Sequence, residues 1–456
     1  MPDPRLDPTP SASRLGDGPA EPRSFAPESL SERIARVAEP LADIDDPAFA
    51  AAFDRFGDRR VVLLGEASHG TSEFYRARAA VTRRLVEQHG FNLVTLEADW
   101  PDAACLNRYV RGQSAKPGAE PPFQRFPTWM WRNREVAAFT DALRAWNAAR
   151  APAQQAGIYG LDLYNLAGSM RAVIDYLDRT DPDAAEVARA RYGCLTPWSQ
   201  EPATYGRLAL TSGHAACEEG VVAMLADLLR RAFDGFDDDE GLLGAVQNAR
   251  LVADAEAYYR AMYYGSAESW NLRDTHMFDT LDSLLAAKGP AAKAVVWAHN
   301  SHIGDASHTD MGKSRGELNL GQLCRERWGR DAALIGFGTH AGEVACASDW
   351  DEPMEVKRVR PSLPESHERL AHDSGLDRFL LDMAKDGELS DALAQPLLQR
   401  FIGVIYRPET ERWSHYVECA LSRQYDAYVW FDETTAVTPL GAEPHEGPGE
   451  TWPFGL

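Results

Sequence analysis

Short apolar runs recur along the chain, and each of them ends in polar or ionisable residues. The first run, Val61 to Leu64, stops at Gly65, which predicts a buried strand followed by a loop. Five more runs share this pattern and occupy residues 92–99, 158–164, 294–302, 333–340 and 403–407. Because a strand that is apolar throughout has both faces covered, such runs are typical of a parallel sheet between helices. The pattern therefore predicts the α/β class, with a mainly parallel sheet flanked by helices.

The polar residues that end these runs indicate a shared site. Parallel strands align their carboxyl ends, and open α/β sheets bind ligands at that edge. The ionisable residues expected there include Glu66, His69, Glu97, Asp162, His299 and His302. Glu66 and His69 lie three residues apart, so the carboxylate can orient an imidazole of near-neutral pKa. A core histidine is the commoner explanation for one such pair, but polar groups at six strand ends predict an active-site rim.

Helical patterns connect the apolar runs. Ser29 to Glu32 matches a capping box, so the first helix is predicted to begin there. A helix over about 71–89 carries Arg78, which lies either within reach of the site or on the surface. Between about 166 and 287 long helical patterns replace the strand signal, which predicts a helical insertion forming a lid or cleft wall. Residues 427–433 form a candidate edge strand.

The ends of the chain differ in composition from its middle. Residues 1–28 are rich in Pro, Ser, Asp and Gly, which predicts a disordered N-terminal tail. Residues 29–456 then form one α/β domain that contains the insertion.

The net charge of −22 limits the choice of partners. It opposes nucleic-acid phosphates and anionic membranes, so neither is an expected partner. No apolar stretch approaches the roughly 20 residues that cross a bilayer, and the first residues lack a signal-peptide pattern. The six cysteines are scattered without a C-x-x-C motif, which fits reduced, mostly buried thiols. These observations predict a cytoplasmic protein.

Two further motifs contain residue types that are found in catalytic sites. His299-x-x-His302 with Glu66, His69 and Glu97 has the residue types of a metal site, but the H-E-x-x-H helix of a zinc hydrolase is missing. We therefore expect no metal and no cofactor, with a metal-dependent hydrolase left open as an alternative. The G-x-S-x-G at 312–316 follows a polar stretch rather than an apolar strand, so it is not predicted to be a nucleophile elbow.

Several ordered motifs together resemble the erythromycin esterase family. They are G-E-A-S-H-G-T-S-E-F (65–74), L-E-A-D (96–99), F-P-T-W-M-W-R-N (126–133), W-N-L-R-D (270–274), W-A-H-N-S-H-I-G-D-A (297–306) and I-G-V-I-Y-R-P-E-T-E-R (402–412). The resemblance implies hydrolysis of the erythromycin lactone by a histidine base, without a serine nucleophile or an essential metal. It implies that His69 is this base, Glu66 its partner carboxylate, Arg78 the site arginine, Glu97 a second glutamate, and His299 and His302 the paired histidines.

The resulting hypothesis is a metal-independent ester or lactone hydrolase. Macrolides are its leading candidate substrates, and antibiotic resistance is the role that this substrate suggests. His69 activates water by general-base catalysis, and Arg78 with one of the paired histidines stabilises the oxyanion. The other histidine protonates the leaving alkoxide. Predicted substrate contacts are Trp129, Trp131, Asp162 and Arg273, with one of the two tryptophans expected in the core. The alternatives are the metal-dependent hydrolase and a non-catalytic protein that binds a small molecule.

Overall fold

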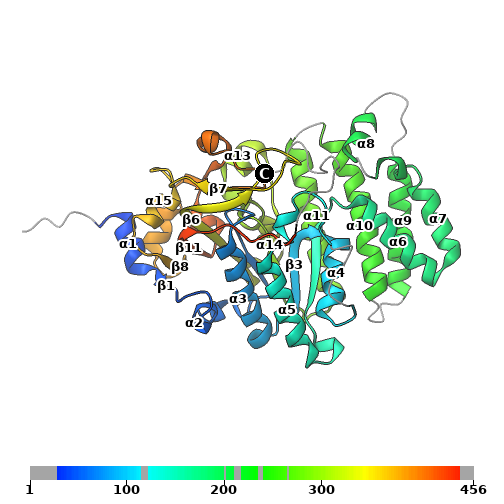
Figure 1. The fold of residues 1–456 in the computed structure, drawn as a ribbon, viewed down its shortest axis with the longest axis horizontal. Coiled ribbons are helices and arrows are strands. Elements are labelled where there is room, and N and C mark those ends of the chain that lie inside the picture. The colour runs from blue at the N-terminus through cyan, green and yellow to red at the C-terminus, as the bar shows by residue number, and fades with distance from the viewer. Residues whose placement is uncertain are drawn as a thin grey trace, which may run out of the picture.

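A nine-stranded sheet crosses the centre of the molecule in the order β1-β8-β11-β6-β2-β5-β3-β4, with β7 paired to β6 (Figure 1). The structure is a computed structural model that describes residues 28–114, 122–199, 202–209, 217–234, 240–263 and 266–441. The strands of this sheet are β1 (Glu39–Pro40), β2 (Val61–Leu64), β3 (Leu93–Asp99), β4 (Gly157–Asp162), β5 (Ala294–Trp297), β6 (Ala332–Cys346), β7 (Glu355–Val359), β8 (Arg378–Asp382) and β11 (Ala427–Thr434). A separate antiparallel pair consists of β9 (Leu397–Arg400) and β10 (Tyr416–Cys419).

The six strands from β11 to β4 pair in parallel, which confirms the predicted fold class. Their apolar runs are buried on both faces, as the sequence indicated. In β2, Val61 and Leu63 belong to one apolar core, whereas Val62 and Leu64 belong to the other. Since successive side chains of a strand point to opposite faces, the sheet separates two cores.

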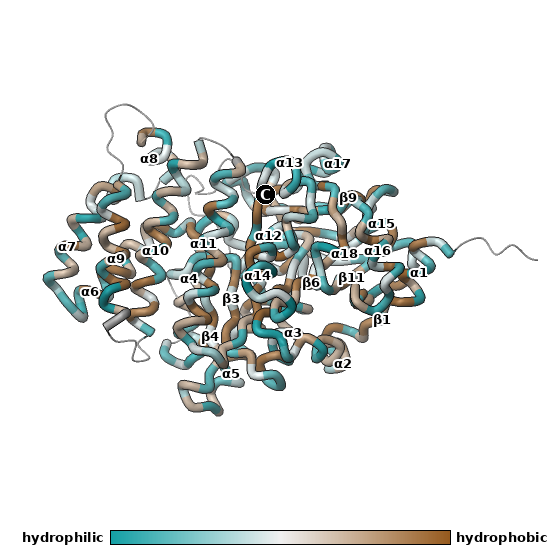
Figure 2. Tube along the Cα trace, turned by 180° about the vertical axis from the view of Figure 1, so that it is seen from behind, coloured by the Kyte–Doolittle hydropathy of each residue, from teal (hydrophilic) through white to brown (hydrophobic). Residues whose placement is uncertain are grey.

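Helices cover both faces of this sheet. Their bounds are α1 (Leu30–Val37), α2 (Pro47–Ala51), α3 (Ser72–His89), α4 (Trp100–Val110), α5 (Arg134–Ala148), α6 (Leu166–Thr180), α7 (Pro182–Tyr192), α8 (Pro202–Ala209), α9 (Glu218–Asp234), α10 (Glu240–Ala261), α11 (Ser266–Ala287), α12 (Asn300–Ile303), α13 (Asp310–Arg315), α14 (Leu320–Trp328), α15 (His367–His372), α16 (Gly387–Leu393), α17 (Glu411–Ser414) and α18 (Leu421–Gln424). Figure 2 shows apolar residues gathered on the central strands and on helices such as α9 and α10.

The helix that follows β2 illustrates how the sequence sets these elements. It runs from Ser72 to His89 and packs Phe74, Val81 and Leu85 into the core. It ends at Gly90, whose φ of 74° is the left-handed cap conformation that glycine adopts without strain. This helix carries Arg78 on its buried side, below the end of β2.

Helices α6 to α11 lie together beside the β4 end of the sheet (Figure 1). No strand occurs among the described residues between β4 and β5. Helix α10 packs against α6, α9 and α11, and it supplies a nearly continuous row of buried residues to one core. The block therefore extends the core sideways, and among its described helices only α11 contributes a side chain to the active-site cavity.

Two predicted strands differ from the structure. Residues 403–407 form no strand; Ile402 and Ile405 make single bridges to Ser68 and Ala347 instead. The predicted edge strand 427–433 is interior, because β8 pairs with its outer side and β1 pairs with β8. The two outer strands, β1 and β8, are antiparallel and short, so the sequence pattern did not predict them.

The chain termini and the cysteines complete the outline. Ser29 and Glu32 form the predicted capping box of α1, whereas residues 1–27 of the predicted tail lie outside the described residues. Cys194 and Cys217 form a disulfide, which corrects the expectation that all thiols are reduced. Cys324, Cys346 and Cys419 are buried free thiols. The described helices include none that is long and apolar enough to cross a membrane, and a cytoplasmic location stays a prediction.

Candidate active site

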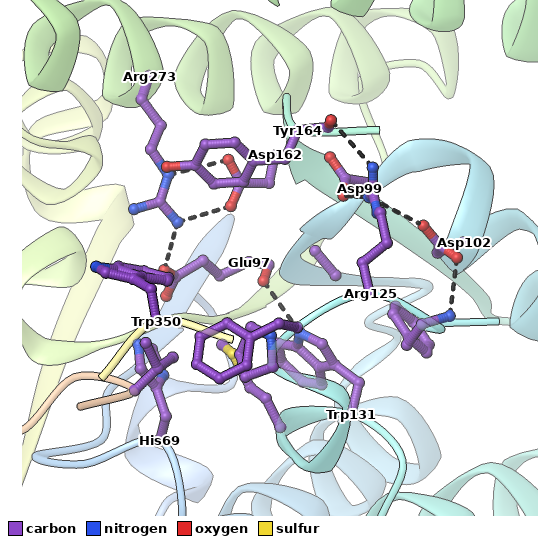
Figure 3. A pocket seen from close by; sticks show the side chains of 16 residues that line it. His69, Glu97, Asp99, Asp102, Arg125, Trp131, Asp162, Tyr164, Arg273 and Trp350 are labelled. Atoms are coloured by element: carbon purple, nitrogen blue, oxygen red, sulfur yellow. Dashed lines mark hydrogen bonds and ion pairs between the residues drawn. The ribbon is translucent and has the colours of Figure 1, made fainter. Parts of the chain in front are cut away.

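A cavity of about 100 Å³ lies at the carboxyl ends of β2, β3 and β4 (Figure 3). Its ionisable lining is His69, Glu97, Asp99, Asp102, Arg125, Asp162 and Arg273, and its aromatic wall includes Phe126, Trp131, Tyr164 and Trp350. The parallel strands bring His69, Glu97, Asp99 and Asp162 together because their carboxyl ends open on the same edge, while α11 supplies Arg273.

His69 is held by a carboxylate behind it. Glu66 Oε1 lies 2.9 Å from His69 Nδ1, and its Oε2 accepts a hydrogen bond of 2.5 Å from Arg78 Nη2. All three side chains are buried. Glu66 already accepts a hydrogen bond from Arg78, so we assign it as the acceptor for His69 as well, with the ring proton of His69 on Nδ1. The lone pair of Nε2 is then free, and His69 lines the cavity.

Arg78 itself lies outside the cavity lining. Its guanidinium stacks 4.4 Å from the Tyr75 ring and 5.0 Å from the Trp297 ring. Its Nε and Nη1 atoms have no hydrogen-bond partner among the described residues, so Glu66 and the aromatic rings balance its charge. This arrangement gives Arg78 contact with Glu66 rather than with a reacting group.

Glu97 joins the ends of β3 and β5 to helix α11. Its Oε2 accepts a bond of 2.8 Å from the backbone N–H of His299, and Arg273 Nη2 donates to its Oε1 at 2.7 Å. Burial alone would raise the pKa of Glu97, but His302 and Arg273 hold it well below its ordinary value. Glu97 is therefore ionised on the cavity wall.

Arg273 reaches the cavity from α11 and is fixed on two sides. Its Nε donates to Asp162 Oδ1 at 3.0 Å, and its Nη2 donates to Asp162 Oδ2 at 2.6 Å. Its guanidinium also lies 5.0 Å from the ring of Tyr164. Bidentate pairing of this kind sets the plane of the guanidinium, so Arg273 presents a fixed positive charge to the cavity.

His302 lies behind this cluster and does not line the cavity. Both oxygens of Asp274 are 2.9 Å from its Nδ1, and Glu97 Oε1 is 3.3 Å from its Nε2. Burial alone would lower the pKa of His302, but Asp274 and Glu97 outweigh it and raise the pKa to about 9. His302 is thus an imidazolium held between two carboxylates, although Arg273 Nη1, which lies 3.1 Å from its Nε2, opposes the charge.

His299, in contrast to the charged His302, is neutral. Burial and the nearby ring of His69 hold the pKa of His299 well below its ordinary value, so the ring is neutral. Its Nδ1 accepts from the backbone N–H of Ser301 at 3.3 Å, which assigns the proton to Nε2. That Nε2 has no hydrogen-bond partner within the described chain. The rings of His299 and His69 lie 4.8 Å apart, so an unused donor stands beside the free nitrogen of His69.

The sequence-predicted residues therefore separate into two groups. His69, Glu97, Trp131, Asp162 and Arg273 line the cavity. Glu66, Arg78, His299 and His302 are buried behind it. Trp131 donates from Nε1 to the carbonyl of Glu97 at 3.2 Å, whereas Trp129 lies outside the cavity lining and is buried beside Phe126.

The far end of the cavity holds a group that sequence reasoning did not assign. Arg125 Nη2 donates to Asp99 Oδ2 at 2.5 Å and lies 3.6 Å from Asp102 Oδ2. Burial raises the pKa of Asp99 to about 6, although Arg125 opposes the shift. The position of Asp99 at the end of β3 was a signal, but nothing local connects it with Arg125.

Asp274 was also missed as the partner of His302. It stands in the W-N-L-R-D motif, on a helix far from His302 in the sequence, so only the packing of α11 against the β5 turn reveals the pair. Across the described residues, no group of three or more His, Cys, Asp or Glu side chains is arranged to hold a metal ion.

Comparison with known proteins assigns the family. A family model described as erythromycin esterase matches residues 86–434, which is more than half of the chain. The chain belongs to the erythromycin esterase family. It is accordingly a hydrolase that acts on ester bonds.

The individual proteins that the chain resembles are distant from it in sequence. Erythromycin esterase type I of Escherichia coli is 25% identical over 324 residues, covering 64% of this chain and 73% of that protein. A solved structure described as a succinoglycan biosynthesis protein has a TM-score of 0.72 at 22% identity, covering 90% of this chain and 97% of that one. A mutant erythromycin esterase in its open conformation has a TM-score of 0.63 at 18% identity, covering 87% and 98%. At such identities the solved structures bear on the fold alone.

Proposed function

We propose that this esterase-family protein hydrolyses a carboxylic ester or lactone without a metal, with His69 as the general base. The observation that carries the proposal is the pairing of His69 Nδ1 with Glu66 at 2.9 Å, which leaves Nε2 free on the cavity side. A neutral imidazole with one nitrogen fixed and the other free can remove a proton from water. Arg78 acts through Glu66, as a positioning residue.

The reaction proceeds in two proton transfers. His69 Nε2 takes a proton from water while the water oxygen attacks the ester carbonyl. The resulting oxyanion is stabilised by the charge of Arg273, which lines the cavity. As the C–O bond breaks, the imidazolium of His69 returns its proton to the leaving alkoxide. His302 is excluded from acid catalysis in this scheme, since both of its N–H groups already bind carboxylates.

Macrolide lactones are the proposed substrate class, because two relatives from Escherichia coli carry the name erythromycin esterase. The cavity must widen before it can admit a macrolide. Its volume of about 100 Å³ is below the roughly 300–1,000 Å³ of pockets that bury drug-sized ligands. A macrolide therefore requires the aromatic wall, where Phe126 and Trp350 meet edge to face at 5.3 Å, to move apart.

The test uses the purified protein with erythromycin and, in parallel, with p-nitrophenyl acetate. A macrolide esterase adds the mass of one water to erythromycin, and His69→Ala abolishes this gain. Hydrolysis of the acetate without any change in erythromycin would contradict the macrolide as substrate, while the proposal of a hydrolase would stand. If neither compound nor a panel of simple lactones is hydrolysed, the non-catalytic binding protein becomes the better account.

Two variants test whether the aromatic wall limits the entry of a large substrate. Phe126→Ala widens the wall and is expected to raise kcat/KM for erythromycin more than for the acetate. Trp413→Ala removes an aromatic ring that is 85% exposed and outside the cavity, so it serves as the control. Equal effects of Phe126→Ala on both substrates would show that the wall does not limit entry.

A further inference from the structure

A second and larger groove lies on the other side of helix α4 from the catalytic cavity. Its volume is about 600 Å³, and it is formed by α4, β4, α6 and α10. The first turn of α4 separates the two spaces, because Asp99 and Asp102 line the cavity whereas Trp100 and Pro101 line the groove. The groove has the size of a small-molecule site.

Gly244 leaves part of this groove open. It lies inside helix α10, where glycine destabilises a helix relative to alanine. Packing does not require it, since a Cβ at this position would meet only Trp100 Nε1, at an ordinary 3.8 Å. The absence of a side chain at Gly244 keeps the indole N–H of Trp100 uncovered.

Two polar groups beside Gly244 have no partner. Asn248 is 4% exposed; its Nδ2 donates to the Gly244 carbonyl at 2.7 Å, but its Oδ1 accepts no hydrogen bond in the described part of the chain. The indole N–H of Trp100 likewise donates to none of the described residues. Since buried polar groups are normally satisfied, the unused acceptor of Asn248 indicates a missing partner, and the Trp100 indole is a donor that lines the same groove.

The charges along the groove limit what that ligand can be. Its charged lining consists of Arg108, Arg179, Asp175 and Glu240, two of each sign. Such a balanced rim favours a molecule without net charge. A pair of neighbouring hydroxyls fits the floor, since one oxygen can accept from the indole N–H while the next O–H donates to Asn248 Oδ1.

We propose that this groove binds a neutral polyhydroxyl compound, a sugar or polyol, at a site separate from the ester-hydrolysing cavity. The inference does not depend on the proposed reaction, because no side chain that lines the catalytic cavity lines the groove.

Ligand-observed saturation-transfer NMR on the full chain, with maltose and sorbitol as probes, tests the proposal. Gly244→Leu places a side chain over Trp100 and should reduce the signal tenfold or more. Gly387→Leu is the matched control, because a Cβ at this exposed helical glycine has nothing within 4 Å. Asn248→Ala, which keeps the helix but removes the acceptor, should weaken binding about fivefold or more and guards against misfolding of the leucine variant.

Three outcomes would overturn the proposal. The first is the absence of binding by either probe, and the second is equal binding by wild type and both groove variants. The third is stronger binding of gluconate or glucosamine than of the neutral probes, which would assign the groove to a charged ligand. Loss of binding in Gly244→Leu and Asn248→Ala, with retention in Gly387→Leu, supports it.

Discussion

The imidazole of His302 lies flat against the indole of Trp270, with centroids 4.7 Å apart and planes inclined by 10°. A cation over an aromatic face is stabilised by the ring electrons, so Trp270 supports the same charged state of His302 that Asp274 and Glu97 favour. The three contacts make His302 a fixed internal cation between the sheet and helix α11.

This charged state predicts how stability depends on pH. The pKa of His302 is raised from 6.5 to about 9, so between these values only the folded chain retains the proton. The stabilisation is fully present below pH 6.5 and is lost as pH rises through 9, on the order of 3 kcal/mol in total. Denaturant unfolding of wild type and His302→Gln should therefore give free energies that converge between pH 6 and 9.5. A difference that does not change with pH would mean that His302 is neutral in the fold.

His69→Ala should leave the fold intact and lower turnover by about 10² or more, the usual size of a general-base contribution. His308→Ala is the matched control, since the His308 side chain is 39% exposed and lies outside the cavity. Steady-state kinetics and thermal unfolding separate the two possible roles. A large fall in stability with nearly normal kcat would make His69 a structural histidine.

Arg78→Met should destabilise the fold by about 3–5 kcal/mol, because it leaves the buried Glu66 carboxylate without its cation. Adding Glu66→Gln should restore much of that stability without restoring kcat, since His69 still lacks a carboxylate. Arg83→Met, on the exposed side of the same helix, should change stability by no more than about 0.5 kcal/mol. Full stability of the single Arg78 variant would contradict the pairing described here.

Removal of metal should not stop the reaction. Both nitrogens of His302 face carboxylates, so His299 and His302 cannot act together as a pair of metal ligands. Protein purified without added ions is expected to hold less than one equivalent of zinc, manganese or iron, and to remain active after prolonged chelation. One tightly bound metal per chain, whose removal and return switch activity, would establish the metal-dependent alternative.

The apolar periodicity was sufficient to predict the parallel strands and to place His69, Glu97 and Asp162 at one edge of the sheet. The ends of parallel strands align independently of how the helices pack. It did not predict which neighbours face the cavity. Trp129 and Trp131 are two residues apart in an irregular turn, and only the packing shows that Trp131 lines the cavity. Arg78 and Arg273 are both on helices, yet one lies behind Glu66 and the other lines the cavity.

The outer strands escaped prediction for a different reason. β1 has two residues, and in β8 only Phe379, Leu380 and Leu381 are apolar, so neither gives an apolar run that stands out from a loop. Their pairing depends on distant partners, and this made an interior strand of 427–434 look like an edge.

The strand order has a consequence for how the chain acquires its structure. β2 and β3 are joined only through β5, which lies between them and is made after the whole α6–α11 block. Contacts of such high sequence separation slow folding, because a long loop must close before they form. During synthesis, a nascent chain that ends before residue 294 lacks β5, the strand that joins β2 to β3. Hydrolysis should therefore appear only once β5 has left the ribosome and inserted between them.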